Sequence, residues 1–221
     1  MTSDIISSNI ENGEDSQNYF WENTVARAKG DWLGDEKDPV VNMEVIDGSL
    51  VMTAEVWGQA REITQALTDL KWEIQKEVNG KKEETSEFNA GDRIYVSFNS
   101  PADGYAAIYL IEGNDDTSCL LPYRAHTSGK FPIKGGKNYT FFDKTTDPQA
   151  PTYKMNTTSP EEYNQLVIIY SPNSFTKSND VTGDKLHPNS LSTADFQKWL
   201  LKCQRADRDM VVNKKWIKIK Q

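Results

Sequence analysis

Residues 91–142 constrain the fold more than any other part of the chain, because they read as short strands joined by turns. Ile94, Val96 and Phe98 alternate with Arg, Tyr and Ser, and this period of two is typical of a half-buried strand. A dense cluster of turn-forming residues then fills positions 99–104. The stretch therefore predicts β structure that reverses direction often.

The strand expected at residues 105–111 is apolar on both of its faces. A strand of this kind belongs in the middle of a sheet that is covered on both sides. Further short apolar runs end at Pro122 and resume after the Gly135-Gly136 turn. Several strands at this spacing favour a sandwich or a barrel. We expect a mainly β fold, a β-sandwich of antiparallel strands with one C-terminal helix docked on it.

Length and charge limit the classes of function. The 221 residues suit one domain with elaborations or two small domains, and a 37% hydrophobic content is enough for a core. The net charge of -8 argues against a nucleic-acid binder, which needs a basic face, and to a lesser degree against binding to anionic membranes. No stretch approaches the roughly twenty apolar residues of a membrane helix, so no transmembrane segment is expected.

We expect three parts along the chain. Residues 1–18 are polar and should be disordered or loosely attached. Residues 19–87 should form an N-terminal strap and hairpins that pack on the main domain. Residues 88–221 should form the β-sandwich domain itself.

Two hairpins are predicted before residue 88 by two-residue turns whose backbone matches the twist of strands. Asp47-Gly48 is the turn of the first, at residues 40–57. Asn79-Gly80 is the turn of the second. Residues 59–70 fit either one face of a helix or a continued strand, and the sequence leaves both open.

The clearest local signal predicts a helix near the C-terminus. Ser192 is placed as an N-cap with Asp195 three residues later, a variant of the capping box. A helix is therefore expected at residues 193–205, docked on a sheet, with a last strand at 210–220. Its inner face would carry four residues at helical spacing: Phe196, Trp199, Leu200 and Cys203.

Residues that could carry chemistry are few. Cys119 and Cys203 both lie in apolar contexts, which favours two separate buried thiols, with a disulfide as the alternative. His126 and His187 lie in predicted loops with no spaced partner for a metal site. No serine-nucleophile elbow and no glycine-rich phosphate loop is present. We expect no enzyme, no catalytic residues, no metal and no cofactor.

The order of several segments resembles a known family: GDRIYVSF, GYAAIYLI, CLLPYR, KNYTFF, LVIIYSPNSF and LSTADFQKWLLKCQRADRDM. Together they are similar to the bacterial domain-of-unknown-function family 4384, most of all its Bacteroidetes branch, over about residues 88–220. The resemblance implies a β-rich module in a supporting role, often exported or joined to caspase-like peptidases or kinases. It carries over no catalytic residues, and because a caspase-like Cys/His pair is missing, any peptidase would be a separate partner.

One candidate binding patch comes from the aromatic and arginine content of the central stretch. Tyr105, Tyr123 and Arg124 could form an exposed patch of the kind enriched in binding hot spots. The alternative is that both tyrosines complete the edge of the core and Arg124 pairs with an acid. The sequence leaves both interpretations open.

The leading functional hypothesis is a non-enzymatic binding or accessory module for a protein partner. That partner would be a caspase-like peptidase or another component of a bacterial signalling or cell-envelope system. The alternative is an extracytoplasmic module that binds a glycan or small ligand, and a hydrolase is third. The compartment stays open: periplasm or cell surface if a signal peptide has been trimmed, cytoplasm otherwise.

Overall fold

The computed structural model describes residues 30–46, 49–62, 70–112, 116–123, 129–180 and 188–221. The chain divides into two compact units, Met1–Gln65 and Ala66–Gln221. The expected division after residue 87 stays a prediction. The second predicted hairpin, which precedes that position, pairs with a sheet of the second unit.

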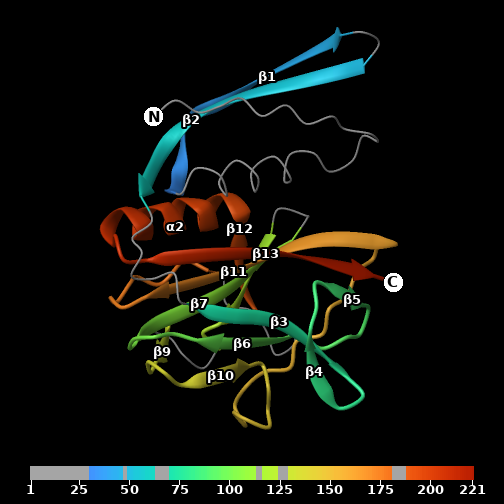
Figure 1. The fold of residues 1–221 in the computed structure, drawn as a ribbon, viewed down its shortest axis with the longest axis vertical. Coiled ribbons are helices and arrows are strands. Elements are labelled where there is room, and N and C mark those ends of the chain that lie inside the picture. Colours follow the sequence, from blue (N-terminus) through green and yellow to red (C-terminus); the bar gives the residue numbers. More distant parts are fainter. Residues whose placement is uncertain (1–29, 47–48, 63–69, 113–115, 124–128, 181–187) are drawn as a thin grey trace. The chain divides into compact units, whose positions relative to one another are not determined.

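The first unit contains one long hairpin, drawn in blue and cyan in Figure 1. Strand β1 (Gly30–Ile46) pairs antiparallel with strand β2 (Ser49–Glu62). The predicted hairpin at residues 40–57 is confirmed and is longer than expected. Of the segment left open between helix and strand, the part up to Glu62 is strand, and residues 63–69 lie outside the described part.

The second unit contains a four-stranded antiparallel sheet in the order β10-β6-β3-β4. A tight turn joins β3 to β4, and both of its residues have positive φ, 52° at Asn79 and 77° at Gly80. This is the backbone that an Asn-Gly hairpin turn requires, so the second predicted hairpin is confirmed. The strands are β3 (Lys71–Val78), β4 (Lys81–Glu84), β6 (Tyr95–Asn99) and β10 (Asn138–Phe141).

A seven-stranded sheet forms the other layer of the second unit, in the order β12-β8-β7-β11-β13-β5, with β9 also paired to β7. Its neighbouring strands run antiparallel, except that β5 pairs parallel with β13. The strands are β5 (Glu87–Asn89), β7 (Gly104–Ile111), β8 (Asp116–Leu121), β9 (Phe131–Ile133), β11 (Glu161–Ser171), β12 (Asn189–Ser192) and β13 (Val211–Lys220).

The main hydrophobic core lies between the two sheets, which makes the second unit a β-sandwich. Ile108 of β7 is fully buried there, together with Val96 and Phe98 of the four-stranded sheet. The Phe98 ring lies 6.1 Å from that of Tyr170 and 6.0 Å from that of Phe141, centroid to centroid, so aromatic contacts link strands of both sheets. The alternation seen at residues 94–98 thus marks the inward face of β6.

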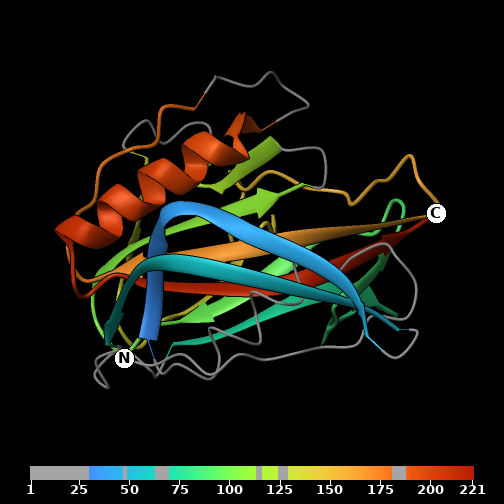
Figure 2. The same ribbon diagram turned by 90° about the horizontal axis from the view of Figure 1, so that it is seen from above.

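A second core lies on the opposite face of the seven-stranded sheet, beneath helix α2 (Thr193–Ala206). Figure 2 shows the helix lying across this sheet. The helix begins as predicted, because the Ser192 hydroxyl accepts a hydrogen bond from the backbone N–H of Asp195 at 3.1 Å. Phe196 packs on Tyr109 of β7, with ring centroids 4.7 Å apart. Strand β7 is therefore covered on both faces, which confirms the reading of residues 105–111.

Candidate interaction surface

The sequence-predicted patch is not assembled as one surface. Tyr123 is 4% exposed and belongs to the core between the sheets, where its hydroxyl accepts a hydrogen bond from the N–H of Phe142 at 3.3 Å. Tyr105 is half-buried against the core beneath the helix, with the Lys130 ammonium 5.5 Å from its ring centroid. These two tyrosines lie on opposite faces of the seven-stranded sheet, and Arg124 lies outside the described residues.

The two cysteines are buried and unpaired in the structure. Burial raises the pKa of the Cys119 thiol to about 12, and it also raises the pKa of Cys203. Because the thiolate is the nucleophilic form, Cys119 is held in its unreactive state at neutral pH. His126 and His187 lie outside the described residues, and the described residues contain no cluster of side chains suited to a metal ion.

A buried polar cluster lies at the edge of the core beneath the helix. Tyr109 and Ser178 share a hydrogen bond at 3.0 Å between their hydroxyl oxygens. The Asp180 carboxylate is 3% exposed, accepts a hydrogen bond from Asn189 at 3.0 Å and lies 3.1 Å from the Lys177 ammonium. Burial raises the pKa of Tyr109, which keeps its hydroxyl protonated. The cluster fastens the segment after β11 to the sheet, which is a structural role.

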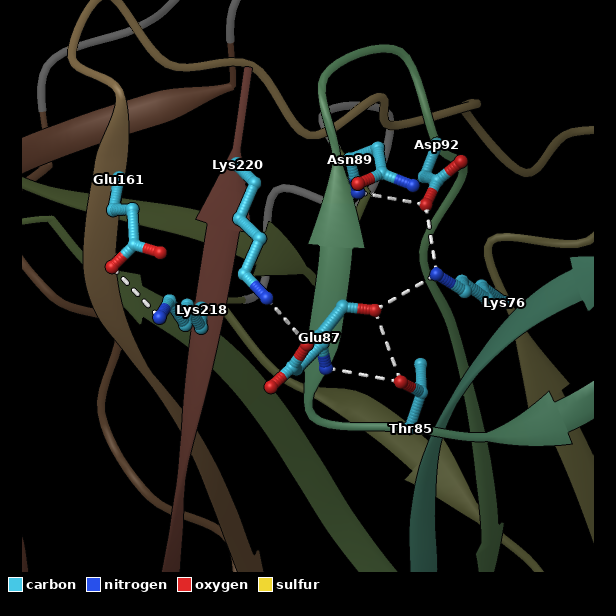
Figure 3. Close-up of polar contacts among 8 residues, drawn as sticks. All are labelled: Lys76, Thr85, Glu87, Asn89, Asp92, Glu161, Lys218 and Lys220. Atoms are coloured by element: carbon cyan, nitrogen blue, oxygen red, sulfur yellow. Dashed lines mark hydrogen bonds and ion pairs between the residues drawn. The ribbon is translucent and has the colours of Figure 1, made fainter.

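A charged cluster closes one edge of the sandwich and is shown in Figure 3. Lys76 of β3 donates to the backbone carbonyl of Glu87 on β5 at 3.0 Å and to the Asp92 carboxylate at 3.1 Å. The same Asp92 oxygen accepts from the backbone N–H of Asn89 at 2.8 Å. Because Lys76 belongs to the four-stranded sheet and Glu87 to the seven-stranded sheet, these bonds tie the two layers together.

The charges in this cluster compensate each other. The Lys220 ammonium lies 2.8 Å from the Glu87 carboxylate, and this hydrogen bond holds the pKa of Glu87 below its usual value. Lys218 lies 2.7 Å from Glu161, which raises the pKa of the lysine. Pairs of this kind are typical of a solvated strand surface and offer no uncompensated charge for an ionic ligand.

The hairpin of the first unit carries the most exposed apolar side chains that the structure describes. Met43 and Val45 are 68% and 70% exposed, and Val41 beside them is 45% exposed. Because side chains alternate along a strand, these three lie on one face of β1. The register Met43↔Met52 and Val41↔Ala54 adds two residues of β2 to the same face. We name this set of five residues, Val41, Met43, Val45, Met52 and Ala54, the apolar face.

The opposite face of the same segment is polar or mixed. It carries Val40, Asn42 and Glu44 on β1, and Val51, Thr53 and Glu55 on β2, according to the same register and alternation, and Val40 is 46% exposed. The two acidic side chains in this part of the hairpin therefore point away from the apolar face. The result is an amphipathic hairpin whose apolar face bears no charge.

The hairpin also has two strand edges without a paired strand among the described residues. In the part of the chain that the structure describes, no third strand pairs with β1 or β2. A single two-stranded hairpin is at best marginally stable in water, and additional strands or packing against another surface are needed to stabilise it. An exposed strand edge is also a ready template for pairing with another chain. Chemically, the hairpin can bury its apolar face or extend its sheet.

Sequence reasoning missed this surface although its signal was present. The alternation Val41, Met43, Val45 before the Asp47-Gly48 turn predicts a strand with one apolar face. The expectation that residues 19–87 pack on the main domain stays a prediction. Whether a strand face is exposed depends on the other segments that pack on it. The periodicity of one segment gives no information about those segments.

Comparison with known proteins assigns no relative to this chain. A scan against protein-family models finds no match, and neither the search of curated proteins nor the search of solved structures finds one. Among the described residues, no helix is long and apolar enough to cross a membrane. The resemblance to family 4384 thus gains no support from these comparisons and stays a prediction.

Proposed function

We propose that the chain is a non-enzymatic binding module that engages a protein partner through the apolar face of its β1–β2 hairpin. The observation that carries this proposal is the exposure of Met43 and Val45 on a two-stranded sheet. Single exposed apolar residues are common, but a contiguous set framed by polar residues marks an interaction site.

Two observations support an accessory role rather than catalysis. The Cys119 thiol is held neutral by burial, and the charged cluster around Glu87 is internally compensated. A catalytic site needs a nucleophile with a base to activate it, and perturbed groups that face a cleft. The resemblance to family 4384 points the same way. It also suggests the class of partner, namely a caspase-like peptidase or another signalling component.

A protein partner fits the surface better than a glycan does. Glycan sites need exposed aromatic rings that stack on sugar rings, and the two candidate tyrosines do not supply such a pair. Tyr123 is buried, and Tyr105 is half-buried on the other face of the sheet. The exposed surface of the hairpin is aliphatic and methionine-rich, and flexible Met side chains adapt well to protein surfaces.

The test compares two substitutions at adjacent positions of one strand. Met43→Asp places a charge on the apolar face, whereas Asn42→Asp places the same charge on the opposite face. Each variant is expressed with a tag at the native locus, cross-linked in cells and analysed by quantitative mass spectrometry. We expect a protein recovered with the wild type to be lost with Met43→Asp and retained with Asn42→Asp.

Folding is checked in the same samples. Circular dichroism and thermal melting of the purified variants should show an unchanged second unit, and Met43→Leu should restore recovery because it restores apolar surface. Equal recovery with Met43→Asp and Asn42→Asp would contradict the proposal, because it would show that the apolar face is not used.

A further inference from the structure

We propose that the partner supplies an extended segment that adds as a third strand to the outer edge of β2, the edge that faces away from β1. The added segment alternates apolar residues with lysine or arginine. This inference rests on the proposed function and names the part of the partner that the hairpin binds. Three features of the hairpin support it: the different build of its two edges, the lack of a third strand among the described residues, and the charge beside β2.

The outer edge of β1 is interrupted in the first half of the strand. Between Trp32 and Val40 the register with β2 shifts three times, and at each shift β1 contains one residue more than β2. Bulges of this kind leave residues unpaired and bend the strand. The interrupted part also contains Pro39, which has no backbone N–H to donate. Bulges and proline are two of the devices that prevent an edge strand from pairing with another chain.

The outer edge of β2, by contrast, is continuous. Strand β2 runs over 14 residues, Ser49–Glu62, and contains neither a proline nor an extra residue against β1. Along an antiparallel strand, the backbone N–H and C=O groups of every second residue point away from the paired strand. The outer edge of β2 is therefore a regular row of donors and acceptors. Of the two edges, it is the one on which another strand can pair over its whole length.

A third strand would complete the hairpin as a sheet. Two strands alone are marginally stable in water, whereas independent stability needs three or more strands with a hydrophobic face, or packing on another element. An added strand places every second side chain beside Met52 and Ala54, so apolar residues at these positions would widen the apolar face. In strand addition the backbone hydrogen bonds supply affinity, and the alternating side chains supply specificity.

The charge beside β2 selects the other side chains of the added strand. On the polar side of the hairpin, Glu44 lies on β1 and Glu55 lies on β2, and residues 40–55 contain no lysine or arginine. Opposite charges on neighbouring strands stabilise a sheet, whereas like charges directly opposite each other destabilise it. The net charge of the chain, -8, also favours the approach of a basic segment. Lysine or arginine is therefore expected on the polar side of the added strand.

The test uses a synthetic peptide of about ten residues in which valine alternates with lysine, a length that spans most of β2. Calorimetric titration measures its binding to the purified full chain, beside a matched peptide in which glutamate replaces lysine. We expect the lysine peptide to bind at least about tenfold more tightly than the glutamate peptide. A lysine peptide with every backbone nitrogen methylated should bind at least about tenfold more weakly than the unmodified one, because it cannot donate to β2.

A charge reversal shows which edge the peptide uses. Glu55 lies beside the proposed strand, whereas Glu44 lies one strand farther away, and both side chains are exposed. Glu55→Lys should weaken binding of the lysine peptide about three- to tenfold, because it replaces an attraction between neighbouring strands by a repulsion. Glu44→Lys is the matched control and should weaken it about twofold or less, since salt screens exposed charges about 10 Å apart. The reverse order would place the peptide on β1 and overturn the inference.

Three further results would also overturn the inference. They are equal binding of the methylated peptide, equal binding of the lysine and glutamate peptides, and no binding of either. None of them affects the proposed function, because the loss of a cellular partner with Met43→Asp tests that function separately. Sedimentation of the wild type alone addresses a second copy as the occupant. A mass that rises to that of a dimer, and that the lysine peptide does not lower, would contradict a basic segment of another protein.

Discussion

The outer strands of the β-sandwich and the strands of the N-terminal hairpin handle free backbone edges in opposite ways. Strand β4 has only four residues, all of them charged and exposed, and β5 has three residues. Strands β10 and β12 have four residues each. By contrast, β1 and β2 have 17 and 14 residues and an uncharged apolar face.

This difference indicates which part of the chain is built for association. Short edges and charged side chains prevent a sheet from pairing with other chains, and the sandwich uses both. In its distal part, from Val40 to Glu55, the hairpin has long strands and carries charged side chains on one of its two faces only. The four edge strands of the sandwich are short, whereas the two strands of the hairpin are long. Among the described strands, the hairpin is therefore the part best suited to contact another chain.

The largest effect is expected in the core between the sheets. Phe98→Ala should lower the free energy of unfolding by about 3–5 kcal/mol, because Phe98 is 2% exposed and its ring contacts aromatic rings of both sheets. Met43→Ala should change it by less than about 0.5 kcal/mol, because its side chain is exposed. Urea denaturation followed by fluorescence measures both. Comparable losses would show that the hairpin belongs to the folding core.

The next effect concerns an anchor of edge strand β4. The Lys82 ammonium lies 2.7 Å from the buried Asp143 carboxylate, which also accepts hydrogen bonds from the N–H and hydroxyl of Thr145 at 3.0 and 2.8 Å. Burial alone would raise the pKa of Asp143, but these partners outweigh burial and hold it below its usual value. Asp143→Asn should cost on the order of 1–3 kcal/mol at pH 7.

The dependence on pH has a definite sign. Because the pKa of Asp143 is lower in the folded state, its contribution is complete above the unfolded value of about 3.9 and is lost as the pH falls through the folded value. The difference in unfolding free energy between wild type and Asp143→Asn should therefore shrink as the pH falls from about 5 toward 2. Urea denaturation at a series of pH values measures it. A constant difference would show that Asp143 does not carry the effect.

A smaller effect is expected at the start of helix α2. Ser192→Ala removes the hydroxyl that accepts a hydrogen bond from Asp195 N–H, and it should cost about 1 kcal/mol. Ser192→Asp should recover most of this loss, because a carboxylate can accept the same bond and favours a helix N-terminus. Thermal melting by calorimetry compares the three proteins. Equal stability of the alanine and aspartate variants would contradict the capping role.

The smallest effect on stability is expected where the edge protection itself is removed. Lys81→Val with Glu83→Val replaces two exposed charges of β4 and should change the unfolding free energy by no more than about 0.5 kcal/mol. The same variant should associate at high concentration, because only two of the four charges of β4 then remain to discourage pairing with another chain. Light scattering detects this, with Lys144→Val and Gln149→Val together as a control outside any strand. A variant that scatters no more than this control would weaken the comparison.

Much of the fold could be predicted from the sequence because its signals are local. Alternation identified the inward face of β6, and Asn79-Gly80 identified a turn whose positive φ values the structure shows. Ser192 and the helical spacing after it identified helix α2 almost to the residue. Each of these features depends on residues within about one turn or one strand of each other, so periodicity and capping chemistry were sufficient.

Strand partners and burial depend on residues that are distant in the sequence. Strand β5 pairs with β13 across the length of the domain, and alternation says nothing about partners. Alternation also shows which residues share a face but not what covers that face. Tyr123 therefore became part of one core, Tyr105 was placed against the other, and Met43 was left exposed. The burial of a residue results from packing against segments that are remote in the sequence. Burial in turn decides which side chains are available at the surface for a binding site.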